Sequence, residues 1–107
     1  MIVFTLRILV LESDRRRVIT SFEPLIAWSR VQPGCRACHL LTDIEDPRGL
    51  VLLEEWDTQE HLDCHLRSED YRRVLAAIEL SQETPQIHFD TVATRGGIEV
   101  VEAARAR

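Results

Sequence analysis

The segment 50-LVLLEEWDTQEHLDCHLRSEDY-71 changes its apolar periodicity from that of a strand to that of a helix. Leu50 to Trp56 is an apolar run of strand length, and alternate residues, Glu54 and Trp56 among them, share one face. Thr58 to Leu66 then has apolar residues at helical spacing, which returns between residues 71 and 78. The segment therefore predicts a strand that is followed directly by a helix.

The N-terminal part of the chain predicts another strand and helix. Apolar residues alternate from Ile2 to Val10, so one face of this strand is wholly apolar and the other is mixed. Ser13 or Asp14 can cap the helix that follows, in which apolar residues recur at three- and four-residue spacing. Because Pro24 removes a backbone hydrogen bond inside this helix, we expect a kink near residues 19 and 20 or a break into two pieces.

Two further strands complete the pattern. Pro33-Gly34 ends the first helix, and Cys35 to Asp43 is a strand that turns through residues 45–49 into the strand ending at Trp56, which predicts an antiparallel hairpin. The last strand is Gln86 to Thr94. The order βαββαβ predicts an α+β, ferredoxin-like fold, in which an antiparallel sheet carries its helices on one face.

The uncovered face of this sheet predicts a second subunit. It would carry Val3, Leu9, Val51 and Leu53, or the residues opposite them, which is too much apolar area to expose on four strands. Two sheets packed face to face would bury this area, so we expect a homodimer.

The C-terminal residues are expected to form a tail. Gly96-Gly97 separates a domain of residues 1–95 from residues 96–107. The pattern of the tail fits either a short helix or a strand added to the partner.

Length and composition limit the function classes. The chain has 107 residues, enough for one domain, and its formal net charge of −5 argues against nucleic-acid binding. No segment approaches the ~20 apolar residues of a membrane span, and Met1 to Leu11 lacks the basic start and cleavage site of a signal peptide. We therefore expect a cytoplasmic protein without a membrane partner, with its three cysteines reduced.

The segment Cys35-Arg36-Ala37-Cys38-His39 matches CxxCH, the attachment motif of c-type haem. Attachment needs an oxidising compartment, for which the chain carries no export signal. The only methionine is the initiator Met1, which leaves none for the usual second axial position. Residues three apart on a strand also point to opposite faces, which disfavours haem, zinc or a disulfide at Cys35 and Cys38. We expect an ordinary strand here.

Three sequence features together resemble one protein family. They are the pattern Glu54-x-Trp56, eight residues, His65, five residues, Tyr71; the turn Pro33-Gly34-Cys35; and the loop Asp46-Pro47. From about Ile2 to Val92 the chain is similar to the antibiotic biosynthesis monooxygenase family of the dimeric α+β barrel superfamily. The resemblance implies a dimeric barrel that oxygenates a quinol-like or polycyclic aromatic substrate with dioxygen, without flavin, metal or haem as cofactor.

The resemblance also implies roles for four residues. His65 would be the catalytic base, since histidine titrates near neutral pH, and its alternative is a structural histidine bonded to a carbonyl or carboxylate. Trp56 would form a wall of the substrate pocket, against the plainer role of a core residue. Tyr71 and Glu54 would complete the substrate-binding site. Taken alone, Tyr71 is a core residue and Glu54 a partner for an arginine.

No metal site is predicted. His61 and His65 are four residues apart on one helix and could share a metal ion, but neither an HExxH motif nor a third ligand accompanies them.

The chain contains no asparagine. Haem-degrading branches of the resembling family use an Asn, a Trp and a His, so haem degradation is disfavoured. The resemblance also implies an Asn in the pocket of anthrone oxygenases, and this chain lacks that polar group. Two other functions stay open on the same fold: a non-catalytic small-ligand-binding dimer and an isomerase of a small metabolite. A flat hydrophobic pocket would favour the oxygenase or the binding protein, and a polar pocket with clustered Arg and His would favour the isomerase.

Overall fold

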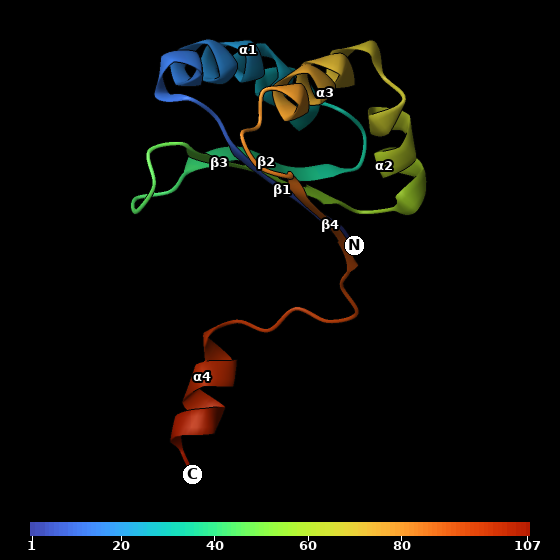
Figure 1. Cartoon of the computed structure of the whole chain (residues 1–107). Helices are drawn as coiled ribbons and strands as arrows, with labels where there is room; N and C mark the ends of the chain where they lie inside the picture. Colours follow the sequence, from blue (N-terminus) through green and yellow to red (C-terminus); the bar gives the residue numbers. More distant parts are fainter.

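Four antiparallel strands form one sheet in the order β2-β3-β1-β4 in the computed structural model, which describes residues 1–107 (Figure 1). The strands are β1 (Ile2–Leu9), β2 (Cys35–Thr42), β3 (Gly49–Trp56) and β4 (Gln86–Thr91). The helices are α1 (Glu12–Arg30), α2 (Gln59–Leu66), the 3-10 turn η1 (Glu69–Tyr71), α3 (Arg72–Glu79) and α4 (Ile98–Arg105). Helices α1 and α3 cover one face, and α2 lies beside one end of the sheet. The predicted α+β, ferredoxin-like βαββαβ fold is confirmed.

The core lies between the sheet and the helices α1 and α3. On β1 every second residue is buried, so that Phe4 and Leu6 point toward the helices, and Leu52 of β3 lies opposite Leu6. Helix α1 contributes Phe22 to this core, and α3 contributes Val74. The strict alternation of β1 and the helical spacing of α1 both follow from this one apolar layer.

One expectation for α1, the identity of its N-cap, is wrong, and one of the two alternatives expected at Pro24 is excluded. The helix is continuous over 19 residues and does not break into two pieces at Pro24, because buried residues on both sides of the proline pack into the same core. Its N-cap position is Leu11, which makes no side-chain cap. Ser13 and Asp14 lie inside the first turn, where the charge of Asp14 suits the positive end of the helix dipole.

Strand β2 contains a β-bulge between Cys35 and Ala37. Cys35 pairs with Trp56 and Cys38 pairs with Glu54, so both cysteines lie on the face that the helices cover. The expectation that they face opposite sides is wrong, because the extra residue of a bulge shifts the alternation by one. Both thiols are free.

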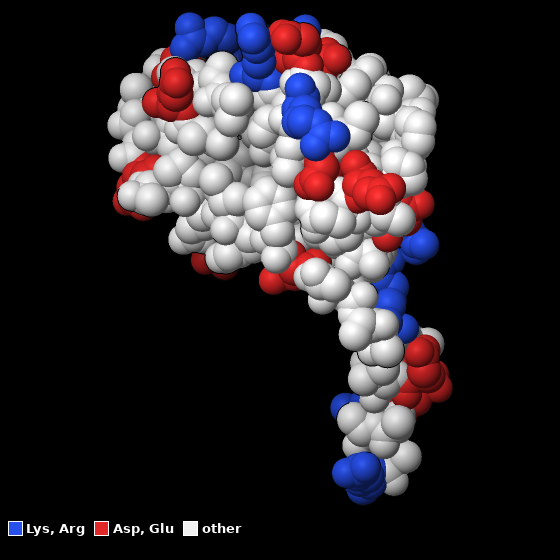
Figure 2. Space-filling view, turned by 90° about the vertical axis from the view of Figure 1, so that its right-hand side faces the viewer, with Lys and Arg blue, Asp and Glu red and all other residues white.

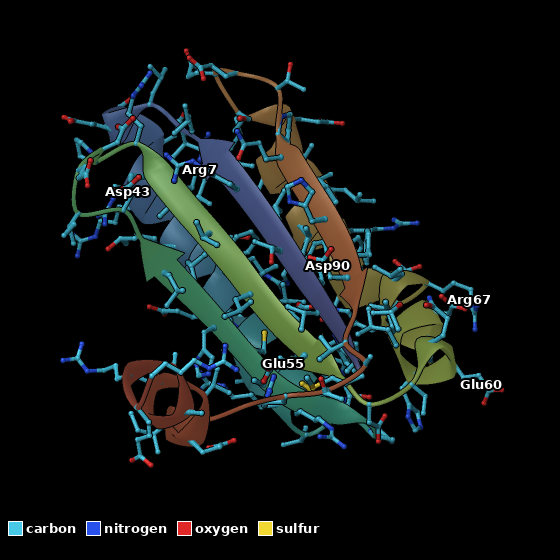
Figure 3. The ribbon with its side chains drawn as sticks, turned by 90° about the horizontal axis from the view of Figure 1, so that it is seen from below. Arg7, Asp43, Glu55, Glu60, Arg67 and Asp90 are labelled. Carbon is cyan, nitrogen blue, oxygen red and sulfur yellow. The ribbon has the colours of Figure 1, made fainter.

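The other face of the sheet, the outer face, carries no helix (Figure 3). Its residues alternate with those of the core as predicted, and the apolar ones on β1 and β3 are only half-buried: Val3, Leu9, Val51 and Leu53. Arg7 and Asp43 form an ion pair of 3.0 Å at one end of this face.

Strand β4 is an exposed edge strand. It ends at Thr91, three residues before the predicted Thr94, and all six of its residues are exposed. The ring of Phe89 lies 4.8 Å from that of Phe4, on the helix side of the sheet. Nearly half of the Phe89 surface nevertheless stays open, so this edge is also apolar.

Helix α4 stands away from the domain, and none of its residues is buried (Figures 1 and 2). The tail is therefore a helix, one of the two forms that its sequence pattern allows. An ion pair between Arg95 and Glu55 fixes the start of the connection to the outer face. On the side of the domain in Figure 2 acidic and basic groups are interspersed. No helix of the chain combines the length and apolar character needed to cross a membrane.

We propose that the domain ends at residue 95 and that residues 96–107 form a separate tail. A chain that ends at Arg95 should unfold within ~0.5 kcal/mol of the full chain in urea, since α4 buries no side chain. A larger loss of stability at micromolar concentration would mean that α4 packs against protein, and the domain boundary would be wrong.

Candidate functional site

The end of β3 and the helix α2 together bring the candidate residues into one place. Alternation along β3 directs Glu54 and Trp56 to the helix side, where both are fully buried. The Thr58 hydroxyl caps α2 by accepting a hydrogen bond from the His61 N–H. Since α2 begins three residues after β3 ends, its second turn brings His65 back over Glu54.

Glu54 is the polar centre of this site. Its carboxylate accepts hydrogen bonds from Trp56 Nε1 at 3.1 Å and from His65 Nε2 at 3.2 Å, and the Cys38 thiol lies 3.7 Å away. These three partners can all donate, which is the environment that stabilises an ionised carboxylate out of contact with water. The partner of Glu54 is therefore His65. The arginine partner that is most common for a lone glutamate is not the one it has.

Aromatic rings enclose the His65 imidazole. Trp56 and Trp28 lie over it, with ring centroids 4.6 Å and 5.6 Å away, and Tyr71 meets it edge-on at 5.5 Å. The Nε2 atom of His65 faces Glu54, and its Nδ1 atom is buried without a hydrogen-bond partner. The ring is thus held in one orientation, and Nδ1 is the nitrogen that makes no hydrogen bond.

Burial and the nearby Glu54 charge keep the surrounding acidic groups protonated. Burial first, and the Glu54 carboxylate second, raise the pKa of Cys38 to about 12 and that of Tyr71 to about 12. The pKa of Cys35 is raised by the same two causes. These thiols are therefore weak nucleophiles near neutral pH.

A cavity of about 100 Å³ opens beside His65. The residues that line it come from α1, the turn after it, the end of β3, and α2 with the loop beyond it: Trp28, Gln32, Pro33, Trp56, His61, Cys64, His65 and Ser68. Of the four predicted site residues, His65 and Trp56 line the cavity. Glu54 and Tyr71 do not line it, and they contact His65 from outside the cavity.

Trp28 is a wall residue that the sequence reasoning missed. It lies in the last turn of α1, three residues after the buried Leu25 and next to the buried Ser29. That helical spacing would have placed it at the edge of the buried face. Its approach to His65 depends on the packing of α1 against the end of β3, which no local pattern reports.

His61 and Asp57 form a second pair at the cavity. His61 Nδ1 lies 2.8 Å from Asp57 Oδ1 and 3.0 Å from the Thr58 hydroxyl. The hydrogen bond from His61 is the largest cause that lowers the pKa of Asp57. No three His, Cys, Asp or Glu side chains come together in an arrangement that could hold a metal ion.

Removal of Glu54 should destabilise the fold strongly. Glu54→Ala leaves the buried Trp56 and His65 donors, and the Cys38 thiol, without an acceptor and should lower the unfolding free energy by about 3–5 kcal/mol. Glu54→Gln keeps one acceptor and should lower it by about 1–3 kcal/mol. Glu55→Ala on the outer face is the matched control, with an expected loss below ~1 kcal/mol. Urea unfolding measures all three, and equal losses at positions 54 and 55 would contradict the central role of Glu54.

Stability should fall in alkaline solution. The pKa of Cys38 is raised from 9.0 and that of Tyr71 from 10.0, both to about 12. The unfolded chain therefore releases these protons first, so the stabilisation is complete below pH 9 and is lost as the pH rises toward 12. Urea unfolding over this range should show the decline, and Tyr71→Phe should make it less steep. A stability that stays constant up to pH 12 would contradict the raised pKa values.

The chain is similar to known proteins in sequence and in fold. The family model described as antibiotic biosynthesis monooxygenase matches residues 1–77. A crystal structure described as an antibiotic biosynthesis monooxygenase superposes with a TM-score of 0.78 at 22% identity, covering 88% of this chain and 100% of the other. A Mycobacterium tuberculosis protein superposes with a TM-score of 0.79 at 20% identity over 90% and 98% of the two chains.

A conserved protein from Methanosarcina mazei has a TM-score of 0.76 at 22% identity, over 83% of this chain and 89% of the other. No curated protein matches the sequence. The structural likenesses confirm the fold. The family model covers most of the chain, from β1 into α3 and through the whole region of the cavity, and so this protein belongs to the antibiotic biosynthesis monooxygenase family.

Proposed function

We propose that the protein is a cofactor-independent monooxygenase that acts on a quinol-like or polycyclic aromatic molecule. The observation that carries the proposal is the buried Glu54–His65 pair, which leaves His65 Nδ1 without a hydrogen-bond partner, beside two tryptophan rings that line a cavity with His65. Aromatic walls suit a flat substrate. The cavity volume of about 100 Å³ favours the entry of a single ring, with the rest of a larger substrate outside.

In the proposed reaction His65 Nδ1 takes the proton of the substrate hydroxyl or activated C–H group. The resulting anion supplies the electrons that reduce dioxygen, and one oxygen atom forms a new carbon–oxygen bond. The second oxygen atom leaves as water with the two hydrogens that the substrate loses. Glu54 supports the proton transfer, because its carboxylate stabilises the imidazolium that forms. The aromatic shell excludes water from the reactive anion.

A non-catalytic ligand-binding dimer is the second candidate. The observation in its favour is that two tryptophan rings pack on the His65 ring and that its Nδ1 atom has almost no accessible surface. An isomerase of a small polar metabolite is less well supported, because no arginine lines the cavity.

We also propose a homodimer, formed through the outer face of the sheet. The half-buried apolar residues of that face, Val3, Leu9, Val51 and Leu53, support it, since water contact with such area is unfavourable. Free cysteines, including the exposed Cys64, support a reducing cytoplasmic location.

Light scattering at micromolar concentration should give about twice the chain mass of 12.3 kDa. Leu53→Asp places a charge in the centre of the outer face and should shift the mass toward that of one chain. A monomeric mass for the unmodified protein would contradict the dimer.

Oxygen uptake tests the activity. With a reduced naphthoquinol or an anthrone, the protein should consume dioxygen faster than the spontaneous reaction, without added flavin or metal. His65→Ala should lower the rate by about two to four orders of magnitude, the usual effect of losing a general base. Trp28→Ala should mainly raise KM, since it removes part of a wall that binds the ground state and the transition state alike.

The matched control is His88→Ala, because His88 is exposed on β4 and lies outside the cavity. Its rate should equal that of the unmodified protein. Tight binding of a quinol without oxygen uptake would favour the ligand-binding dimer.

A further inference from the structure

A second carboxylate–histidine pair lies at the mouth of the cavity, and the proposed reaction makes no use of it. It consists of His61 and Asp57, whose Nδ1 and Oδ1 atoms are 2.8 Å apart. The His61 side chain is 42% exposed, whereas that of His65 is 1% exposed. Of the two histidines that line this cavity, His61 is therefore the one in contact with solvent.

The hydrogen bonds of His61 leave one ring nitrogen available. Asp57 is an acceptor, and its pKa is lowered, so a proton on His61 Nδ1 is held toward its carboxylate. His61 Nε2 makes no hydrogen bond with the protein. This is the arrangement in which a neutral imidazole accepts a proton at one nitrogen while a carboxylate supports the other.

The turn before β2 packs directly against this pair. Gly34 has a φ of +83°, and a Cβ atom there would lie 2.3 Å from His61 Nδ1 and 2.5 Å from Asp57 Oδ1. The Gly34 carbonyl also accepts a hydrogen bond from the Asp57 N–H at 2.9 Å. Because the backbone of the turn fills the space behind the two side chains, His61 and Asp57 are held in place at the cavity.

We propose that the His61–Asp57 pair is a second acid–base site, which binds and ionises a phenolic or enolic hydroxyl at the cavity mouth. The ligand ring lies against Trp28 and Trp56, and its hydroxyl faces His61. The O–H bond breaks, an N–H bond forms on Nε2, and the imidazolium stays paired with Asp57. The inference rests on the proposed function only in taking the cavity as a site for an aromatic ring.

The charges around His61 fit this step. Asp57 compensates the imidazolium, and Arg36 of β2 is the other charged group whose field reaches Asp57. His65 and Cys64 on the same helix also line the cavity. Glu60 and Arg67 of this region point outward to solvent in Figure 3, so their charges are screened by water.

The probe for this site is 4-nitrophenol, because its phenolate is coloured and its ionisation can be measured without any reaction. At a pH below its own pKa, binding to the unmodified protein should increase the phenolate fraction about tenfold or more, the effect of an adjacent cation on an acid. His61→Gln should abolish this increase, and Asp57→Asn should reduce it. His88→Gln, remote from the cavity, is the matched control and should keep it.

Each result of the 4-nitrophenol experiment either supports or overturns the proposed His61–Asp57 site. Failure of the probe to bind, binding without added phenolate, or an increase that persists in His61→Gln would overturn the inference. Gly34→Ala gives an independent check, since its Cβ displaces the pair without removing it and should lower the phenolate fraction. Added phenolate without oxygen uptake from any quinol would leave this site intact and count against the monooxygenase alone.

Discussion

The buried carboxylate of Glu54 is the group on which the arrangement of the site depends. It has no accessible surface, and a carboxylate in that position is tolerated only while donors surround it. Those donors come from three elements: Trp56 follows on β3, Cys38 lies on β2, and His65 lies on α2. The Glu54 carboxylate therefore holds α2 against the end of the sheet through its hydrogen bond with His65.

The β-bulge in β2 and the small apolar cluster around Leu62 both support the site around Glu54. The bulge in β2 brings Cys35 to the helix side together with Cys38, so the end of the sheet presents its thiols and the Glu54 carboxylate to one region. Leu62, one turn before His65, is buried with Ile2 and Trp56 in a small apolar cluster of its own. That cluster anchors α2 next to the carboxylate. The Glu54–His65 hydrogen bond is consequently supported by packing on both sides.

Periodicity was sufficient to predict the elements and part of the site. Alternation along β3 predicts that Glu54 and Trp56 share a face, and helical spacing places His65 on the next element. The bulge was not predictable, because period-two alternation assumes that no extra residue is inserted. Nor was the stacking of Trp28 on His65, which joins segments 37 residues apart through tertiary packing alone. The continuity of α1 through Pro24 has the same cause, since core packing outweighs the local effect of one residue.

We infer that Glu54 holds His65 through Nε2 and leaves Nδ1 to accept a proton. Nitrogen-15 NMR of the imidazole rings, with His65→Gln for assignment, measures this directly. In the neutral imidazole the proton of His65 should reside on Nε2, where it exchanges slowly with water because the site is buried, and Nδ1 should carry none. A neutral ring with its proton on Nδ1, or an Nε2 proton in fast exchange with solvent, would show that Glu54 does not hold His65 in this way.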